Sequence, residues 1–180
     1  MSDDEPKKGH NKWLVFALVA VLSLVADQAT KIWARASLPT FPANCAVPDD
    51  MMGDHPRCIG VPDGVIDSFW HWRLSMNPGS AFGLFSSQGG ARVFLSFVGI
   101  AAVIGMLWML RKSRPEQKVL HWALALVAGG AVGNLIDRIL YGVVTDFILW
   151  HVGDKIQGAH AGTTRWAHEW PVFIASSHSQ

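Results

Sequence analysis

VLHWALALVAGGAVGNLIDRILYGVVTDF, residues Val119–Phe147, begins as an apolar run and ends among polar side chains. The part from Val119 to Ile136 carries almost no charge and approaches the roughly 20 residues that a helix needs to cross a bilayer. Four polar side chains then gather at or just beyond its end: Asn134, Asp137, Arg138 and Asp146. The stretch therefore predicts a membrane-spanning helix with a polar cluster at one end.

Two further segments have the length and apolar character of a membrane span, Trp13–Trp33 and Val93–Leu110. A single such segment could be a buried helix of a soluble protein, but three in one chain of 180 residues favour the bilayer. The composition agrees, because 50% of the residues are hydrophobic and only 16% are charged. The sequence predicts an α-helical membrane protein with three spans, and it has no basic patch that would indicate binding to nucleic acid.

Basic residues predict the orientation of these spans. Positive charges concentrate before the first span and in the link between the second and third, at Lys7, Lys8, Lys12, Arg111, Lys112, Arg114 and Lys118. The positive-inside rule places both regions in the cytoplasm, so residues 1–12 form a cytoplasmic tail and residues 37–92 an outer loop. A cleaved signal peptide ending at Ala34-Arg35-Ala36 is the alternative, although Asp27 and Lys31 are unusual so close to a cleavage site.

The polar residues of the spans converge on one depth. At 1.5 Å per residue, Asp27 lies about 21 Å from the inner end of the first span, and Asp137 about 27 Å from Val119. Asp27 and Lys31 have i, i+4 spacing, which suits an ion pair, and Gly129 with Gly133 forms a GxxxG motif that permits close helix packing. Ionisable residues within membranes are commonly functional. A polar clamp that orders the helices and a transporter-like polar path remain alternatives.

The outer segments predict a small β-structure. Residues 70–77 alternate between apolar and polar side chains, which predicts a half-buried strand with four apolar side chains on one face: Trp70, Trp72, Leu74 and Met76. The β-branched segment 142–150 also favours an extended conformation. Cys45 and Cys58 could form a disulfide on an oxidising outer face or remain two free thiols.

Four blocks of this sequence resemble the lipoprotein signal peptidases, and they stand in that family's order: ADQATK (26–31), NPGSAFG (77–83), GGAVGNLIDR (129–138) and GVVTDF (142–147). The resemblance implies a peptidase domain over residues 13–147 and a monomeric, four-span aspartic endopeptidase without a cofactor. Such an enzyme cleaves the signal peptides of prolipoproteins before a lipid-modified cysteine, at the outer face of the bacterial inner membrane.

The same resemblance assigns roles to individual residues. It implies that Asp146 is one of two catalytic aspartates and that seven further positions shape the site and hold substrate: Asp27, Lys31, Asn77, Gly79, Asn134, Asp137 and Arg138. Residue chemistry alone does not choose between Asp137 and Asp146, because both are acids on the predicted outer side.

No metal site is expected, since the outer histidines lack the spacing of a metal-binding motif.

The C-terminal segment departs from the family pattern. The second aspartate is expected in a block like FNxAD, but this chain reads WPVFIASSHSQ, which places Ser176 or Ser177 at that position. We therefore expect residues 148–180 to form an outer segment and a truncated tail without the fourth span, and the chain to be inactive as written. Three explanations remain open: a truncated or frameshifted copy, an inactive relative that binds lipidated peptides, and an active enzyme with a substitute acid such as Asp154 or Glu169.

Overall fold

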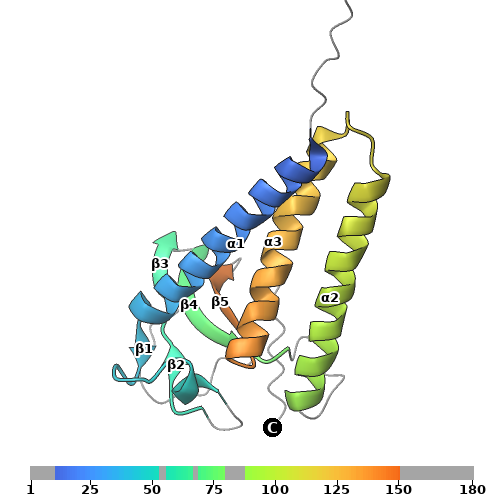
Figure 1. The fold of residues 1–180 in the computed structure, drawn as a ribbon. Helices are drawn as coiled ribbons and strands as arrows, with labels where there is room; N and C mark the ends of the chain where they lie inside the picture. Colours follow the sequence, from blue (N-terminus) through green and yellow to red (C-terminus); the bar gives the residue numbers. More distant parts are fainter. Residues whose placement is uncertain (1–10, 53–55, 67–68, 80–87, 151–180) are drawn as a thin grey trace, which may run out of the picture. The chain divides into compact units, whose positions relative to one another are not determined.

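The computed structural model describes residues 11–52, 56–66, 69–79 and 88–150. Three long helices contain most of these described residues: α1 (Lys12–Ser37), α2 (Gln88–Lys112) and α3 (Lys118–Leu140). The remaining elements are a short helix, η1 (Asp49–Met51), and five strands: β1 (Thr40–Phe41), β2 (Ile59–Gly60), β3 (Asp63–Ile66), β4 (Trp70–Asn77) and β5 (Val144–Trp150) (Figure 1).

The three helices confirm the predicted spans. Within the described residues, Lys12–Ser37, Arg92–Lys112 and Lys118–Leu140 are long and apolar enough to cross a membrane. Many of their large apolar side chains are exposed, among them Leu22, Phe97 and Val127, as expected for helices that face lipid. At their ends the helices run a few residues beyond the predicted apolar runs.

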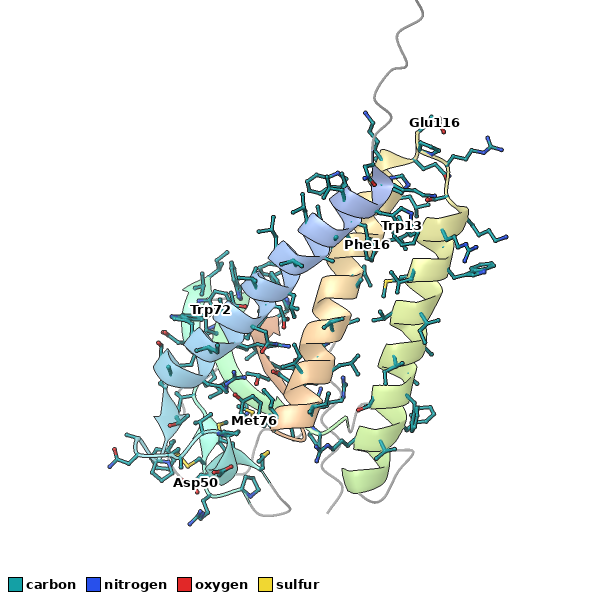
Figure 2. The ribbon with its side chains drawn as sticks, in the orientation of Figure 1. Trp13, Phe16, Asp50, Trp72, Met76 and Glu116 are labelled. Carbon is teal, nitrogen blue, oxygen red and sulfur yellow. A yellow bond between two sulfur atoms is a disulfide. The ribbon has the colours of Figure 1, made fainter. Side chains whose placement is uncertain are left out.

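The chain divides into two compact units, each of which contains parts of the long helices. Unit 1 comprises residues 1–28 and 96–136, and unit 2 comprises residues 29–95 and 137–180. The core of unit 1 consists of apolar side chains from all three helices: Phe16, Val19, Met106, Leu110, Leu124, Ala125 and Ala128. Figure 2 labels Phe16, which extends from α1 into this core.

Close packing of α1 on α3 confirms the predicted role of the GxxxG glycines. A Cβ atom on Gly129 would lie 2.6 Å from the backbone oxygen of Ala20 and equally close to the side chain of Ser23. A Cβ atom on Gly133 would collide with the carboxyl group of Asp27. At this close approach Ser23 Oγ donates a hydrogen bond to the carbonyl oxygen of Leu126, at 3.1 Å. The two small residues thus allow the helices of unit 1 to approach at this level.

Replacing Gly129 with Ala is expected to destabilise the protein by about 1–3 kcal/mol, the usual range for overpacking. The reason is that the added methyl group would meet backbone of α1, which cannot rotate away as a side chain can. Gly130→Ala is the matched control, since a Cβ there has no atom within 4 Å and alanine favours a helix over glycine by about 0.5–1 kcal/mol. Thermal unfolding in detergent measures the stability of both variants. Equal stability of Gly129→Ala and Gly130→Ala would contradict this close packing.

Unit 2 contains two antiparallel sheets, one of β1 and β2 and one with the strand order β3-β4-β5. The structure confirms both predicted strands, since β4 covers residues 70–77 and β5 lies within 142–150. A bulge shifts the register of β4 against β5 between Trp72 and Ser75, although Trp72, Leu74 and Met76 still pack in one core as predicted. After the bulge Ser75 pairs with Asp146 and Asn77 with Val144. Since paired residues share a face of the sheet, Asn77 and Asp146 lie on the same face.

The structure also resolves the alternatives for the two cysteines, because Cys45 and Cys58 form a disulfide. The loop that it closes contains η1, where the side chain of Asp50 forms an ion pair with Arg57. Val47 and Met51 from this loop pack against a second buried core made of Ala34, Leu38 and Leu74. Figure 2 shows Asp50 beside the yellow bond of the disulfide. The covalent link and this apolar contact hold the loop against α1 and β4.

Candidate active site

Asp137 is the centre of a buried ionic cluster in unit 2. Its side chain has no exposed surface, and its Oδ2 atom lies 3.4 Å from the Nζ atom of Lys31. The same oxygen accepts a hydrogen bond from the backbone N–H of Thr145, at 2.9 Å. The guanidinium Nη1 of Arg35 lies 3.7 Å from the other carboxylate oxygen. Two cations and an N–H group thus compensate this carboxylate, as a buried charge requires.

Helix α1 supplies both cations of this cluster. Lys31 and Arg35 are one turn apart on the same face of α1, and both are largely buried. Sequence reasoning identified Lys31 through its spacing from Asp27, whereas the structure adds Asp137 as its partner. Arg35 was missed as a site residue, because its contacts with Asp137 and Thr145 join segments that are distant in the sequence.

Asp146 lies on β5 in a different chemical setting. Its Oδ2 atom accepts a hydrogen bond from the side-chain Nδ2 of Asn77, at 3.0 Å. The Oδ1 atom of Asn77 accepts in turn from the backbone N–H of Gly79, at 2.8 Å, which fixes the orientation of the amide. Gly79 has a φ angle of 95°, a backbone conformation that favours glycine. The predicted residues Asn77, Gly79 and Asp146 therefore form one hydrogen-bonded chain.

Burial raises the pKa of the Asp146 carboxyl above its ordinary value. The hydrogen bond from Asn77 and the positive charges of Lys31 and Arg138 act in the opposite direction and lower the pKa, while the nearby charge of Asp137 raises it. Desolvation is the largest of these effects, so Asp146 keeps its proton to a higher pH than a solvated aspartate does. A carboxyl that retains its proton more readily is better suited to act as a general acid than a solvated aspartate is.

The two acids that the sequence left undecided have different environments. Asp137 is fully buried and held by Lys31 and the Thr145 N–H group, which suits a structural anchor. Asp146 is only partly buried, accepts a hydrogen bond from a neutral amide and has a raised pKa, which suits acid–base chemistry. Arg138 also belongs to this unit, and its charge acts on Asp146.

The remaining predicted site residues have other positions. Asp27 and Asn134 belong to unit 1, where Gln28 donates hydrogen bonds to Asp27 Oδ2, at 3.0 Å, and to the carbonyl oxygen of Gly133, at 3.2 Å. Sequence reasoning did not identify Gln28 as the residue that orients Asp27. The C-terminal residues considered for the second acid lie outside the described residues: Asp154, Glu169, Ser176 and Ser177.

Comparisons with known proteins agree with this description. The family model described as Signal peptidase (SPase) II matches residues 19–175. A lipoprotein signal peptidase of Xylella fastidiosa (strain 9a5c) is 33% identical over 166 residues, which cover 91% of this chain and 80% of the relative. The lipoprotein signal peptidase of Xanthomonas euvesicatoria pv. vesicatoria (strain 85-10) is 33% identical over 167 residues, or 91% of this chain and 78% of the relative.

Solved structures show the same likeness. A bacterial membrane enzyme determined by the in meso method at 2.3 Å resolution has a TM-score of 0.57 and 28% sequence identity, with coverage of 80% of this chain and 74% of that chain. A second such structure, at 1.9 Å resolution, also has a TM-score of 0.57, with 26% identity and coverage of 81% and 79% of the two chains.

Three membrane-length helices define this chain as an integral membrane protein, and the carboxyl cluster of unit 2 gives it a candidate acid–base site. The family model extends over most of the sequence, and two curated relatives agree with it. The chain belongs to the signal peptidase II family. Members of this family are proteases that remove signal peptides from prolipoproteins.

Proposed function

We propose that Asp146 supplies one of the two carboxyl groups of an aspartic protease site, and that the substrate is a prolipoprotein with a lipid-modified cysteine. The observation that carries this proposal is the raised pKa of Asp146, beside a neutral amide donor and close to a compensated carboxylate. Family membership supplies the substrate class, since the relatives are lipoprotein signal peptidases.

The chemistry of an aspartic protease explains why this environment is suitable. Two carboxyl groups about 3 Å apart cannot both ionise, so they share one proton. The charged member removes a proton from the attacking water, and the protonated member polarises the scissile carbonyl. Asn77 donates a hydrogen bond to Asp146 from a neutral amide and not from a cation. Burial of Asp146 favours retention of the shared proton. A peptide anchored by acyl chains in the bilayer would present its scissile bond near the ends of the helices.

The family's second aspartate has a serine at the corresponding position of this sequence. Ser176 or Ser177 stands where the family has its second aspartate, and a serine hydroxyl does not share a proton at the pKa of a carboxyl group. With either serine at this position the pair of carboxyl groups is incomplete, so we expect no cleavage by the unsubstituted chain. Asp137 does not take this role in our proposal, because its side chain is fully buried and its charge is compensated by Lys31 and Arg35.

The proposed location is the bacterial inner membrane, with a single chain whose site faces outward. Lys12 Nζ donates hydrogen bonds to the carbonyl oxygens of Arg111, at 3.1 Å, and Ser113, at 2.7 Å. The beginning of α1 and the basic link between α2 and α3 therefore meet at one end of unit 1, as the positive-inside rule requires for a shared cytoplasmic face.

Complementation tests this proposal. A strain depleted of its own lipoprotein signal peptidase would express the unsubstituted chain, Ser176→Asp or Ser177→Asp, and processing of a prolipoprotein would be followed by gel mobility. We expect no processing by the unsubstituted chain and processing by one of the two aspartate variants, because only these supply two carboxyl groups. Processing by the unsubstituted chain would refute the incomplete dyad, and failure of both variants would refute the proposed position of the second acid.

A further inference from the structure

We propose that Arg35 is a positioning residue for the reaction: it holds Thr145, and through Thr145 it sets the position of the Asp146 carboxyl group. The inference rests on the proposed catalytic role of Asp146 and extends it to a residue that no motif of the sequence marks. It depends on the contacts of Arg35 with the end of α3, with the turn that follows and with the first residues of β5.

The Arg35 guanidinium contacts three consecutive parts of the chain that lead to Asp146. Its Cζ atom lies over the ring of Tyr141, in the turn after α3, 4.5 Å from the ring centroid. Its Nη1 atom donates a hydrogen bond to Thr145 Oγ1, at 2.8 Å, and lies 3.7 Å from Asp137 Oδ1. The side chain is only 10% exposed, so these contacts are protected from water and from screening by salt.

Thr145 is held at both of its polar groups. Its backbone N–H donates to Asp137 Oδ2, and its hydroxyl oxygen accepts from Arg35. Thr145 is almost completely buried, and neighbouring residues of a strand point to opposite faces. Fixing Thr145 on one face of β5 therefore fixes the direction in which Asp146 projects on the other, toward Asn77. A displacement of about 1 Å at a reacting group can reduce the rate about 100-fold.

The contact requires arginine and not merely a positive charge. A guanidinium group is planar, so one face can stack on Tyr141 while its edge donates to Thr145. A lysine ammonium is a point charge on a flexible stem and cannot satisfy both requirements together. Lys31 already provides such a charge to Asp137, which leaves Arg35 with the orienting role.

Two pairs of variants test the inference in the full chain. Thr145→Val removes the hydroxyl acceptor and keeps the branched shape, whereas Thr145→Ser keeps the hydroxyl. Arg35→Gln removes the charge and the planar fork, whereas Arg35→Lys keeps the charge alone. Thermal unfolding identifies any variant that does not fold. Thr145→Val is expected to fold, because valine is well accommodated in a strand.

The readout is the pKa of Asp146, followed by carbon-13 NMR of the chain labelled at aspartate carboxyl carbons, with the signal assigned by its loss in Asp146→Asn. We expect Arg35→Gln, Arg35→Lys and Thr145→Val to move this pKa to higher pH, because a displaced carboxyl loses its hydrogen bond from Asn77. Thr145→Ser should leave it unchanged, and adding Thr145→Val to Arg35→Gln should have little further effect.

Two results would overturn the inference. If Arg35→Gln shifts the titration but Arg35→Lys and Thr145→Val do not, Arg35 acts as a charge and not through position. If none of the variants shifts it, the contact with Thr145 has no influence on Asp146. A failure of the proposed function is distinct from both, since it appears as cleavage that survives Asp146→Asn in a processing-competent chain, whatever the titration shows.

Discussion

Replacing Asp146 with Asn in the chain that carries the second aspartate is expected to reduce prolipoprotein cleavage about 1,000-fold or more. Asn keeps the shape of the side chain and its hydrogen bond with Asn77 can be retained, but an amide neither ionises nor holds the shared proton. General acid–base catalysis by a positioned side chain commonly contributes about 10²–10⁴-fold, and an aspartic protease loses both of its proton transfers when one carboxyl group is removed.

The matched control is Asp63→Asn on β3, which makes the same chemical change at an exposed position. Asp63 lies opposite Trp72 in the same sheet, so this variant should retain full cleavage. Initial rates on a purified lipid-modified prolipoprotein measure both variants, and thermal unfolding confirms that each is folded. Retention of more than about a tenth of the rate by Asp146→Asn would exclude a catalytic carboxyl at this position.

Replacing Asp137 with Ala is expected to destabilise unit 2 by about 3–5 kcal/mol, the range measured when one partner of a buried ion pair is removed. The loss leaves Lys31, whose side chain is 4% exposed, and Arg35 as uncompensated buried charges. It also leaves the backbone N–H of Thr145 without the carboxylate that accepts from it. Because the net stability of a domain is about 5–15 kcal/mol, this variant should accumulate poorly.

Arg57→Gln provides the control for this second prediction. It also breaks an ion pair, but the Arg57 side chain is 81% exposed, and exposed pairs contribute about 0–1 kcal/mol. The thermal midpoint of each purified variant, together with its yield in the membrane fraction, measures the difference. Equal effects of Asp137→Ala and Arg57→Gln would mean that the buried cluster does not stabilise the protein.

Much of the fold could be predicted from the sequence because a bilayer imposes a simple length rule. The three spans follow from apolar runs near 20 residues, and the GxxxG glycines correctly marked the contact of α3 with α1. Strand β4 was predicted at its observed limits from alternation alone. The bulge after Trp72 could not be predicted in this way, because it depends on the register with β5, which is distant in the sequence.

The site was predicted less completely, and the reason is again distance along the chain. Motifs identified Lys31, Asn77, Asp137 and Asp146, but not which acid is compensated by cations. That distinction depends on α1 delivering two positive charges to Asp137 and on the bulge placing Asn77 beside Asp146. Arg35 carries no motif and is defined only by its contacts with Thr145 and Tyr141.

The titration of Asp146 in the unsubstituted chain tests the central claim most directly, because it needs neither substrate nor a second carboxyl group. Carbon-13 NMR of the labelled chain in nanodiscs would follow its carboxyl signal from acid to alkaline pH. The burial of Asp146 predicts a pKa above that of a solvated aspartate, despite the opposing influence of Asn77, Lys31 and Arg138. A pKa at or below the ordinary value would show that Asp146 is a stably ionised structural carboxylate, which contradicts its proposed role in proton transfer.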